Sequence, residues 1–330
     1  WEQYEKRLQL EAFKGLNYGR PRWDGSKLKK ETILLLREQG LGDNIQFIRY
    51  AKKIVKKGGT VVVSTRKELE TLFKSLDGVS LVTSGIPEPK HFYRYCPLMS
   101  LPYVFKTDQK SIPSTTPYLF PEKNLVNVWS HKLKKYSGLR VGLTWRGNRS
   151  FTNDRFRSSS LKEVSELLSL KNITFFSLMV DLLEEEQLPK NIVNLGKDFS
   201  DFADTAAAIK NLDLVISVDT AVCHLAGAVG QPVWTMLPKS CDFRWGLKGK
   251  KTKWYPTMTL YRQKVFELKN SFEFQQKIAD KIENTSTGTR MPRANMNAIL
   301  EFDFSLPPLV EQQCIVAKLD VISKEVETAN

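Results

Sequence analysis

Cysteine and histidine are scarce in this sequence, since its 330 residues include four cysteines and three histidines. The cysteines Cys96, Cys223, Cys241 and Cys314 lie far apart and form no C-x-x-C pair. Such spacing is typical of reduced, unpaired thiols, and it argues against a disulfide framework or a structural zinc site. The sequence therefore predicts a protein without a bound metal ion.

Long apolar runs are also missing. No segment reaches the roughly 18 consecutive apolar residues of a membrane span, and the N-terminal WEQYEKRLQL lacks the apolar core of a signal peptide. Neither membrane insertion nor export is indicated, so the cytoplasm is the expected compartment. The chain is long enough for two domains, and its content of 41% hydrophobic residues is enough to build their cores.

Basic residues outnumber acidic ones and give a net charge of +14. Such a field favours nucleic acid, an anionic membrane surface or a phosphate-bearing ligand, and composition alone does not choose among them. The lysines are scattered, as in KKIVKKGG (52–59) and KGKKTKW (248–254), without the interleaved aromatics of a single-strand binding platform. Most of them are therefore interpreted as solvated surface, and charge alone does not indicate DNA binding.

Two series of alternating apolar patterns predict an α/β fold. The first starts at Thr32 with TILLL, DNIQFIRYAKKIVKK, TVVVS, KELETLFKSL and VSLV, which indicates β-α-β-α-β. The proline-rich stretch 86–135 is expected to form irregular connections. The second series runs from LRVGLTW (139–145) to PVWTML (232–237) and ends in an amphipathic helix at 272–282. Two doubly wound domains would then face each other across a cleft, where ligands of such folds bind.

The first ten residues predict a short helix, because Trp1, Tyr4 and Leu8 share one helical face that must pack on something. The chain opens without methionine. We expect it to be a piece of a longer protein with further helices before it, although internal cleavage or a chosen expression boundary would look the same.

Polar loops follow three of the expected strands. In REQGLGDN (37–44), Gly40 and Gly42 permit a tight backbone path, and Asp43 is placed at the start of the next helix. On spacing alone, Asp43 fits a plain N-cap as well as a functional carboxylate. The second loop, WRGNRSFTNDRFRS (145–158), carries four arginines, and guanidinium groups suit phosphate recognition.

The third loop opens the segment DTAVCH (219–224), between the strand patterns NLDLVIS and QPVWTML. This is one β-α-β unit whose helix start offers backbone N–H groups to an anion. The plain alternative is that Asp219 or Thr220 only caps the helix and that His224 is a core histidine bonded to a backbone carbonyl.

Several phrases carry a family resemblance: WDGSKL, EQGLGDNIQFIRYA, CPLMSLP, TWRGN, NDRFRSSSL, DFADTAAAIKNLDLVISVDTAVCHLAGAVGQPVW and WYPTMTLYRQ. From about residue 1 to 282 the chain resembles the glycosyltransferase part of bacterial tetratricopeptide-repeat proteins. That part is related to the ADP-heptose:lipopolysaccharide heptosyltransferases, which have the GT-B fold of two Rossmann-like domains. The resemblance implies sugar transfer from a nucleotide-sugar donor to an acceptor.

The resemblance also implies roles for individual residues. Asp43 would act near the acceptor as the base, on an acceptor-side loop with Gln39, Gly40 and Gly42. The donor diphosphate would lie by Asp219, Thr220 and His224. A basic residue of the second loop would contact the donor phosphate; Arg155 is the nearest positional match, with Arg146 a competitor and Asn148 beside it. The spacing of this loop differs from the heptosyltransferase pattern.

The last segment, 284–330, resembles the C-terminal part of a type I restriction–modification specificity subunit, through LPPL-x-EQ before a helix pattern. The expected division is the end of a helical, tetratricopeptide-like region (1–20), an acceptor-side domain (21–135), a nucleotide-sugar-binding domain (136–283) and this strand and helix tail (284–330). The body of a DNA-reading domain is absent, so DNA is expected as a partner only through the tail.

The function expected from the sequence is an inverting, metal-independent glycosyltransferase that needs no cofactor besides its nucleotide-sugar co-substrate. The acceptor, whether glycan, lipid-linked sugar or protein, is not indicated. Two alternatives stay open. One is a non-catalytic binding module whose partner is held by helical repeats, and the other is a fragment of a DNA specificity subunit.

Overall fold

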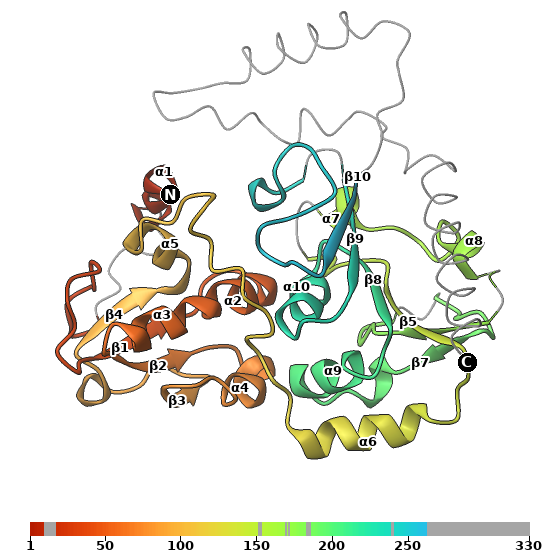
Figure 1. The fold of residues 1–330 in the computed structure, drawn as a ribbon, viewed down its shortest axis with the longest axis horizontal. Coiled ribbons are helices and arrows are strands. Elements are labelled where there is room, and N and C mark those ends of the chain that lie inside the picture. The colour runs from red at the N-terminus through yellow and green to blue at the C-terminus, as the bar shows by residue number, and fades with distance from the viewer. Residues whose placement is uncertain are drawn as a thin grey trace, which may run out of the picture.

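The structure is a computed structural model, and it describes residues 1–9, 18–150, 154–168, 170, 172–182, 186–238 and 241–262. These residues form two parallel β-sheets, each with its own helices, and the two units lie beside each other (Figure 1). The α/β fold of two doubly wound domains is confirmed. The amphipathic pattern at 272–282 and the tail 284–330 lie outside the described residues.

The first sheet has the strand order β3-β2-β1-β4, with all strands parallel. Its strands are β1 (Thr32–Leu36), β2 (Thr60–Ser64), β3 (Val79–Thr83) and β4 (Arg94–Pro97). The helices that accompany them are α2 (Leu41–Phe47), α3 (Ala51–Lys56), α4 (Lys67–Phe73) and α5 (Leu101–Val104). Four of the five residues of β1 are buried, which is why this strand is an uninterrupted apolar run.

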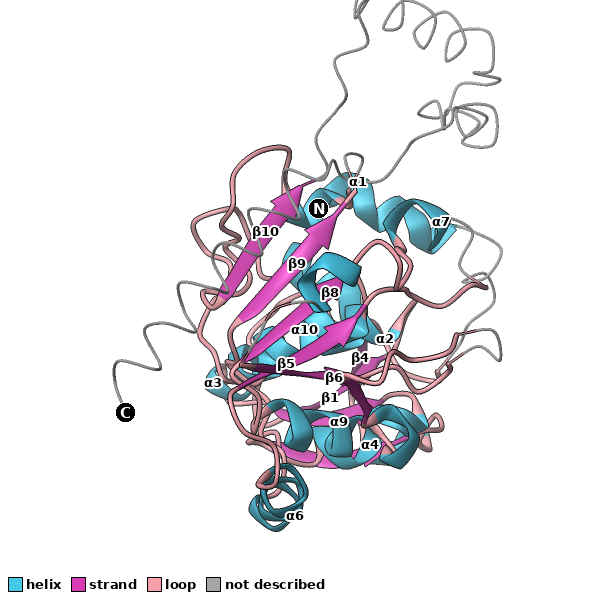
Figure 2. Ribbon diagram, turned by 90° about the vertical axis from the view of Figure 1, so that its right-hand side faces the viewer, coloured by secondary structure: helices cyan, strands magenta, loops and turns pink. Residues whose placement is uncertain are grey.

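The second sheet has the order β10-β9-β8-β5-β6-β7 and is also parallel (Figure 2). Its strands are β5 (Leu139–Thr144), β6 (Ile173–Ser177), β7 (Ile192–Asn194), β8 (Leu214–Val218), β9 (Val233–Leu237) and β10 (Met258–Arg262). The helices are α6 (Lys123–Leu133), α7 (Asp154–Arg157), α8 (Ser165–Leu168), α9 (Phe202–Ile209) and α10 (Ala221–Ala228). From β5 the chain proceeds through β6 and β7 to one edge of the sheet, and it then returns to the other side of β5 with β8, β9 and β10. The carboxyl ends of β5 and β8 are therefore the switch point at which α/β folds bind ligands.

The two domains meet where α2 packs on α10 (Figure 1). Apolar residues of both domains join in one buried cluster, including Phe47 from α2 and Leu225 from α10. Gly42 permits this approach, because a Cβ there would lie 2.8 Å from Cδ2 of His224. The carboxyl end of β1 is thereby held against the start of α10.

Arg49 adds hydrogen bonds across this interface. Its buried guanidinium donates to the carbonyl of Pro113 at 3.0 Å and to the carbonyl of Trp254 at 2.6 Å. It also lies over the rings of Tyr118 and Tyr255, each 4.5 Å away. One side chain thus satisfies carbonyls of both domains.

The short N-terminal helix α1 (Glu2–Glu5) packs as the sequence requires, and Trp1 lies against Phe47 and Trp254. The expectation for 86–135 was wrong in part, since β4 and the 11-residue helix α6 lie there. β4 escaped notice because RYCP is short and ends in proline. The α6 pattern was visible, because Trp129 and Leu133 are one helical turn apart and both buried. The edge strand β10 was also missed.

Within the described part of the chain, no helix is both long and apolar enough to cross a membrane. Cys96, Cys223 and Cys241 are all unpaired, as expected, and Cys314 lies outside the described residues.

Candidate functional site

The loop after β1 presents Asp43 to the other domain. Gly40 is the N-cap of α2, so Asp43 stands in the first helical turn rather than at the helix start. One carboxylate oxygen of Asp43 accepts a hydrogen bond from the Gly40 backbone at 3.0 Å, and the other pairs with Arg244 at 2.7 Å. Asp43 is therefore not the N-cap: its carboxylate bonds the backbone of the N-cap residue Gly40 at the start of α2 and also reaches across the interface to Arg244.

Gln39 precedes this turn in the left-handed region, with φ of 42°. Its side-chain amide donates to the hydroxyl of Tyr4 at 2.8 Å. Asn44 holds the same turn from inside, donating to the carbonyl of Glu38 at 2.8 Å and to that of Gly40 at 2.7 Å. The loop that carries Asp43 is therefore anchored on both sides.

Arg244, on the short 3-10 turn Phe243–Trp245, extends from the second domain to α2. Besides Asp43, its guanidinium bonds Asp242 at 2.8 Å and the side-chain oxygen of Gln46 at 2.8 Å. These carboxylates hold the pKa of Arg244 far above its ordinary value, against the opposing effect of burial. Arg244 is thus a permanent positive charge at the meeting point of the domains.

In the described part of the chain, no side chain caps the start of α10. Thr220 occupies the N-cap position, but its hydroxyl lies 3.1 Å from Ser217 and makes no capping hydrogen bond. The Asp219 carboxylate accepts instead from the indole N–H of Trp245 at 2.8 Å. Burial raises the pKa of Asp219, and Arg244 opposes that effect. Thr220 thus holds the N-cap position, as the plain alternative has it, but without a capping hydrogen bond, and among the described residues no side chain accepts from the first-turn N–H groups, which suit another acceptor.

His224 lies one turn inside α10 and is 3% exposed. Its Nδ1 is 2.9 Å from the hydroxyl of Tyr255, and its ring stacks on Trp245 with centroids 5.2 Å apart. Burial, followed by the field of Arg244, holds its pKa well below the usual value. The imidazole is therefore neutral at pH 7, and it contacts a tyrosine rather than the backbone carbonyl weighed above.

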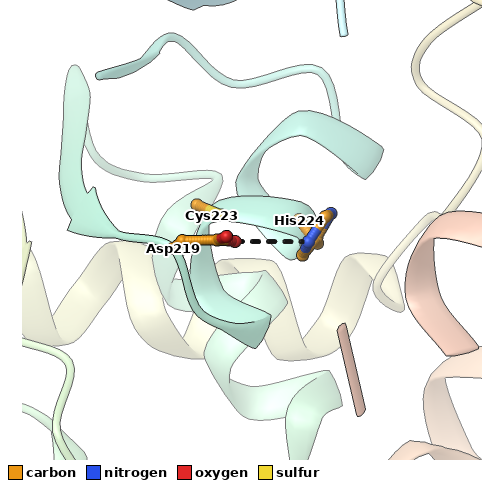
Figure 3. Close-up of side chains that lie close together, drawn as sticks. All are labelled: Asp219, Cys223 and His224. Carbon is orange, nitrogen blue, oxygen red and sulfur yellow. Dashed lines mark ion pairs between the residues drawn. The ribbon is translucent and has the colours of Figure 1, made fainter. Parts of the chain in front are cut away.

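The three ligand-type side chains Asp219, Cys223 and His224 gather at this helix start, with one atom of each within 4.8 Å of the others (Figure 3). The His224 to Asp219 distance is 3.8 Å. Burial raises the pKa of the Cys223 thiol, which keeps it protonated, and Arg244 places a positive charge nearby. The guanidinium of Arg244 near this group favours an anion there by its charge.

The arginines of the loop after β5 bind different partners. Arg146 is buried and bound by the carboxylates of Glu186 at 2.9 Å and Asp181 at 3.1 Å. Arg157 turns to α10 and donates to the Asp219 carbonyl at 2.8 Å. The helix α7 contains Arg155, whose side chain lies outside the described part of the structure. Arg157 therefore places a guanidinium at the helix start, where it is also paired with Asp154 at 2.9 Å, whereas the partners of Arg146 are Glu186 and Asp181.

Asn148, in the same loop, is exposed and accepts hydrogen bonds from the backbone and hydroxyl of Ser150, both at 2.9 Å. It shapes the loop itself. The loops after β1 and β8 are thus brought together, and the loop after β5 reaches them through Arg157.

Sequence reasoning missed Arg244, Trp245 and Tyr255 as parts of this site. Arg244 and Gln46 are 198 positions apart, so no local pattern links them. The available signals were the phrase WYPTMTLYRQ, which contains Tyr255, and a tryptophan next to an arginine after the last recognised strand.

Comparison with known proteins finds a family model and solved structures that this chain resembles. Residues 183–274, which include α9, β8, α10 and β9, match the family described as glycosyltransferase family 9 (heptosyltransferase). A glycosyltransferase family 9 structure from Veillonella parvula superposes with a TM-score of 0.52 at 12% identity, covering 85% of this chain and all of that one. The fold is that of the heptosyltransferases. Escherichia coli ADP-heptose lps heptosyltransferase II gives a TM-score of 0.50 at 13% identity, covering 72% of this chain and 92% of that one.

A curated relative, Protein FlbA of Caulobacter vibrioides, is 27% identical over 295 residues and matches 79% of this chain. The chain spans about half of that protein, 48% of its length. The predicted resemblance to the heptosyltransferases is thus confirmed. The predicted resemblance of the tail is confirmed as well, because residues 250–330 match the type I restriction modification DNA specificity domain. This match begins before residue 284 and overlaps the glycosyltransferase match over 250–274. In the described part of the overlap, β10 is the edge strand of the second sheet and pairs with β9.

Proposed function

We propose that the chain is a glycosyltransferase that binds the diphosphate of a nucleotide-sugar donor at the start of α10. The observation that supports this most is the uncapped first turn of α10, flanked by Arg157, Arg244 and a neutral His224. A partly buried helix start with two guanidinium groups suits a diphosphate. The same groups would stabilise the negative charge that develops on the leaving nucleoside diphosphate, without a metal ion.

Within this proposal, Asp43 is the base that removes the acceptor's proton, and Gln39, Gly40 and Gly42 shape the acceptor side. A direct displacement by the deprotonated acceptor on the face opposite the leaving group makes the reaction inverting. Asp219, Thr220 and His224 line the donor side, and Arg155 and Asn148 stay candidates for it through their loop. Arg146 is the weaker candidate, because its donors are already bound by Glu186 and Asp181.

A substitution can remove one phosphate-binding N–H and little else. Ala221 is the first residue of α10, where proline is well tolerated, and the extended backbone of Thr220 (φ −137°, ψ 175°) suits a residue before proline. We expect Ala221→Pro to weaken nucleoside diphosphate binding by about 10- to 100-fold, the equivalent of one charge-assisted hydrogen bond. Ala221→Ser keeps the N–H and serves as the matched control.

Binding is measured by calorimetry with ADP, GDP, UDP and CDP, and transfer by release of the diphosphate from the matching nucleotide sugars. Melting temperatures show whether the proline ring is accommodated. Equal diphosphate affinity in Ala221→Pro and Ala221→Ser would move the donor away from this helix start. The absence of binding by every nucleotide would contradict the proposed function itself.

A second candidate, a non-catalytic binding module, is favoured by one observation: Asp43 is paired with Arg244 at 2.7 Å rather than left open to an acceptor. Turnover of any nucleotide sugar that depends on Asp43 excludes it.

A further inference from the structure

Arg244 bridges the two halves of the site. Among the described residues, its side-chain hydrogen-bond partners are Asp43 and Gln46 of α2 in the first domain and Asp242 of its own loop. Its side chain is 9% exposed, so these are largely desolvated contacts. The carboxylate proposed as the base is therefore held by an arginine of the donor-side domain.

The same guanidinium acts on the start of α10. Arg244 lowers the pKa of His224 and opposes the rise in the pKa of Asp219, so its charge is felt by both residues. Its neighbour Trp245 bonds the Asp219 carboxylate directly. A diphosphate at this helix start, carrying more negative charge than one carboxylate, would compete with Asp43 for Arg244.

Gln46 provides a second observation in the same place. Its side-chain oxygen accepts from Arg244, which fixes the amide orientation, and its Nε2 is fully buried without a hydrogen-bond partner among the described residues. A buried donor without an acceptor is costly, and such groups are usually satisfied by water or a ligand. Nε2 of Gln46 is therefore an unused donor beside the guanidinium.

We propose that Arg244 is a positioning residue that couples donor binding to release of the base. Without donor, it neutralises Asp43 and joins the domains. With donor, it turns to the diphosphate, so that Asp43 is free to accept the proton of the acceptor. The base is then active only when donor is bound, and an acceptor that binds alone meets a carboxylate neutralised by Arg244. This inference rests on the proposed function, since it requires a diphosphate at α10.

The test is a double-mutant cycle read by nucleoside diphosphate affinity, and it needs no acceptor. Asp43→Asn keeps the size of the side chain and removes the competitor for Arg244. Coupling between charged neighbours of this kind corresponds to affinity changes of roughly five- to fiftyfold. We therefore expect Asp43→Asn to bind the diphosphate roughly five- to fiftyfold more tightly than the parent.

The same Asp43→Asn change in an Arg244→Gln background separates competition from plain charge repulsion. If Arg244 is the shared partner, Asp43→Asn gives no gain there. An equal gain in both backgrounds would show that Asp43 only repels the ligand at a distance and would overturn the inference. Unchanged or weaker binding by Asp43→Asn in the parent background would also overturn the inference, because the ion pair would then only join the two domains. Failure of the parent itself to bind any diphosphate would overturn the proposed function together with the inference.

Discussion

Replacement of Gly227 by alanine tests the packing beneath the site. Gly227 lies in α10 against the ring of Tyr255, and a Cβ there would be 2.6 Å from Cγ and 2.9 Å from Cε1 of that ring, and closer still to Cδ1. Tyr255 is fully buried, its hydroxyl contacts His224, and its ring lies under Arg49. The ring therefore cannot move without disturbing both the donor side and the interface.

The sign of the effect distinguishes two outcomes. Alanine is a better helix former than glycine by about 1 kcal/mol, so a helix with open space around Gly227 would be stabilised. Overpacking a well-filled core costs roughly 1–3 kcal/mol, and a clash with an immobile ring belongs at the upper end. We expect a net loss of about 1–2 kcal/mol in the free energy of unfolding.

Urea denaturation of Gly227→Ala measures this change. Gly85→Ala is the control, since its backbone is not left-handed and the nearest atom to its Cβ would be 3.9 Å away. There we expect no loss, or a gain of about 0.4–1 kcal/mol from the less flexible unfolded chain. A Gly227→Ala protein more stable than its parent would refute the contact between α10 and Tyr255, and with it the placement of His224.

Two further perturbations follow from buried polar groups. Because His224 has a lowered pKa in the folded protein, the unfolded chain binds the extra proton below its ordinary pKa of about 6.5, and stability falls with acidification by up to about 1.4 kcal/mol per pH unit. His224→Gln should remove this loss between pH 6.5 and 5.5. Asp219, whose raised pKa acts with the opposite sign, is present in both proteins and contributes equally to both. If melting temperature falls with pH in parallel for the two proteins, His224 is protonated in the folded protein and the reasoning is wrong. Arg49→Lys should cost roughly 2–4 kcal/mol in urea denaturation, since the buried carbonyls of Gln46 and Trp254 lose a donor worth about 1–3 kcal/mol each. A loss below about 1 kcal/mol would contradict the role of Arg49 in joining the two domains.

The sequence was sufficient for most strands because parallel strands covered on both faces are continuous apolar runs. TILLL, TVVVS and LVISV are such runs, and each forms a strand with four or five buried residues. β4 and β10 lie at sheet edges, where RYCP and MTLYR need not be wholly apolar. The edge strand β3 was predicted because VSLV is an apolar run, whereas RYCP and MTLYR contain arginine within the strand.

The candidate site was predictable only where one loop contained it. The loops with Asp43 and Asp219 were recognised because each joins the carboxyl end of a strand to the start of a helix, which is where α/β folds bind ligands. Arg244 was not, because its importance comes from contacts to α2 made through domain packing. Arg146 is the opposite case, a residue that the sequence favoured and the structure does not. A loop rich in arginine suggested phosphate binding, but the carboxylates of Asp181 and Glu186, distant in the sequence, bind its side chain.

The acceptor-side loop also depends on the N-terminal segment. Arg7 forms a buried ion pair with Glu38 at 2.9 Å, and Glu38 in turn accepts from the backbone of Met99 at 2.8 Å. The next residue, Gln39, holds a left-handed backbone, which costs a non-glycine residue roughly 1–2 kcal/mol, and its bond to Tyr4 offsets part of that cost. Tyr4 also packs on Phe243, beside Arg244. Displacement of α1 would therefore release the turn that presents Asp43 and the loop that presents Arg244 together, so α1 is a structural part of the site rather than an appendage to it.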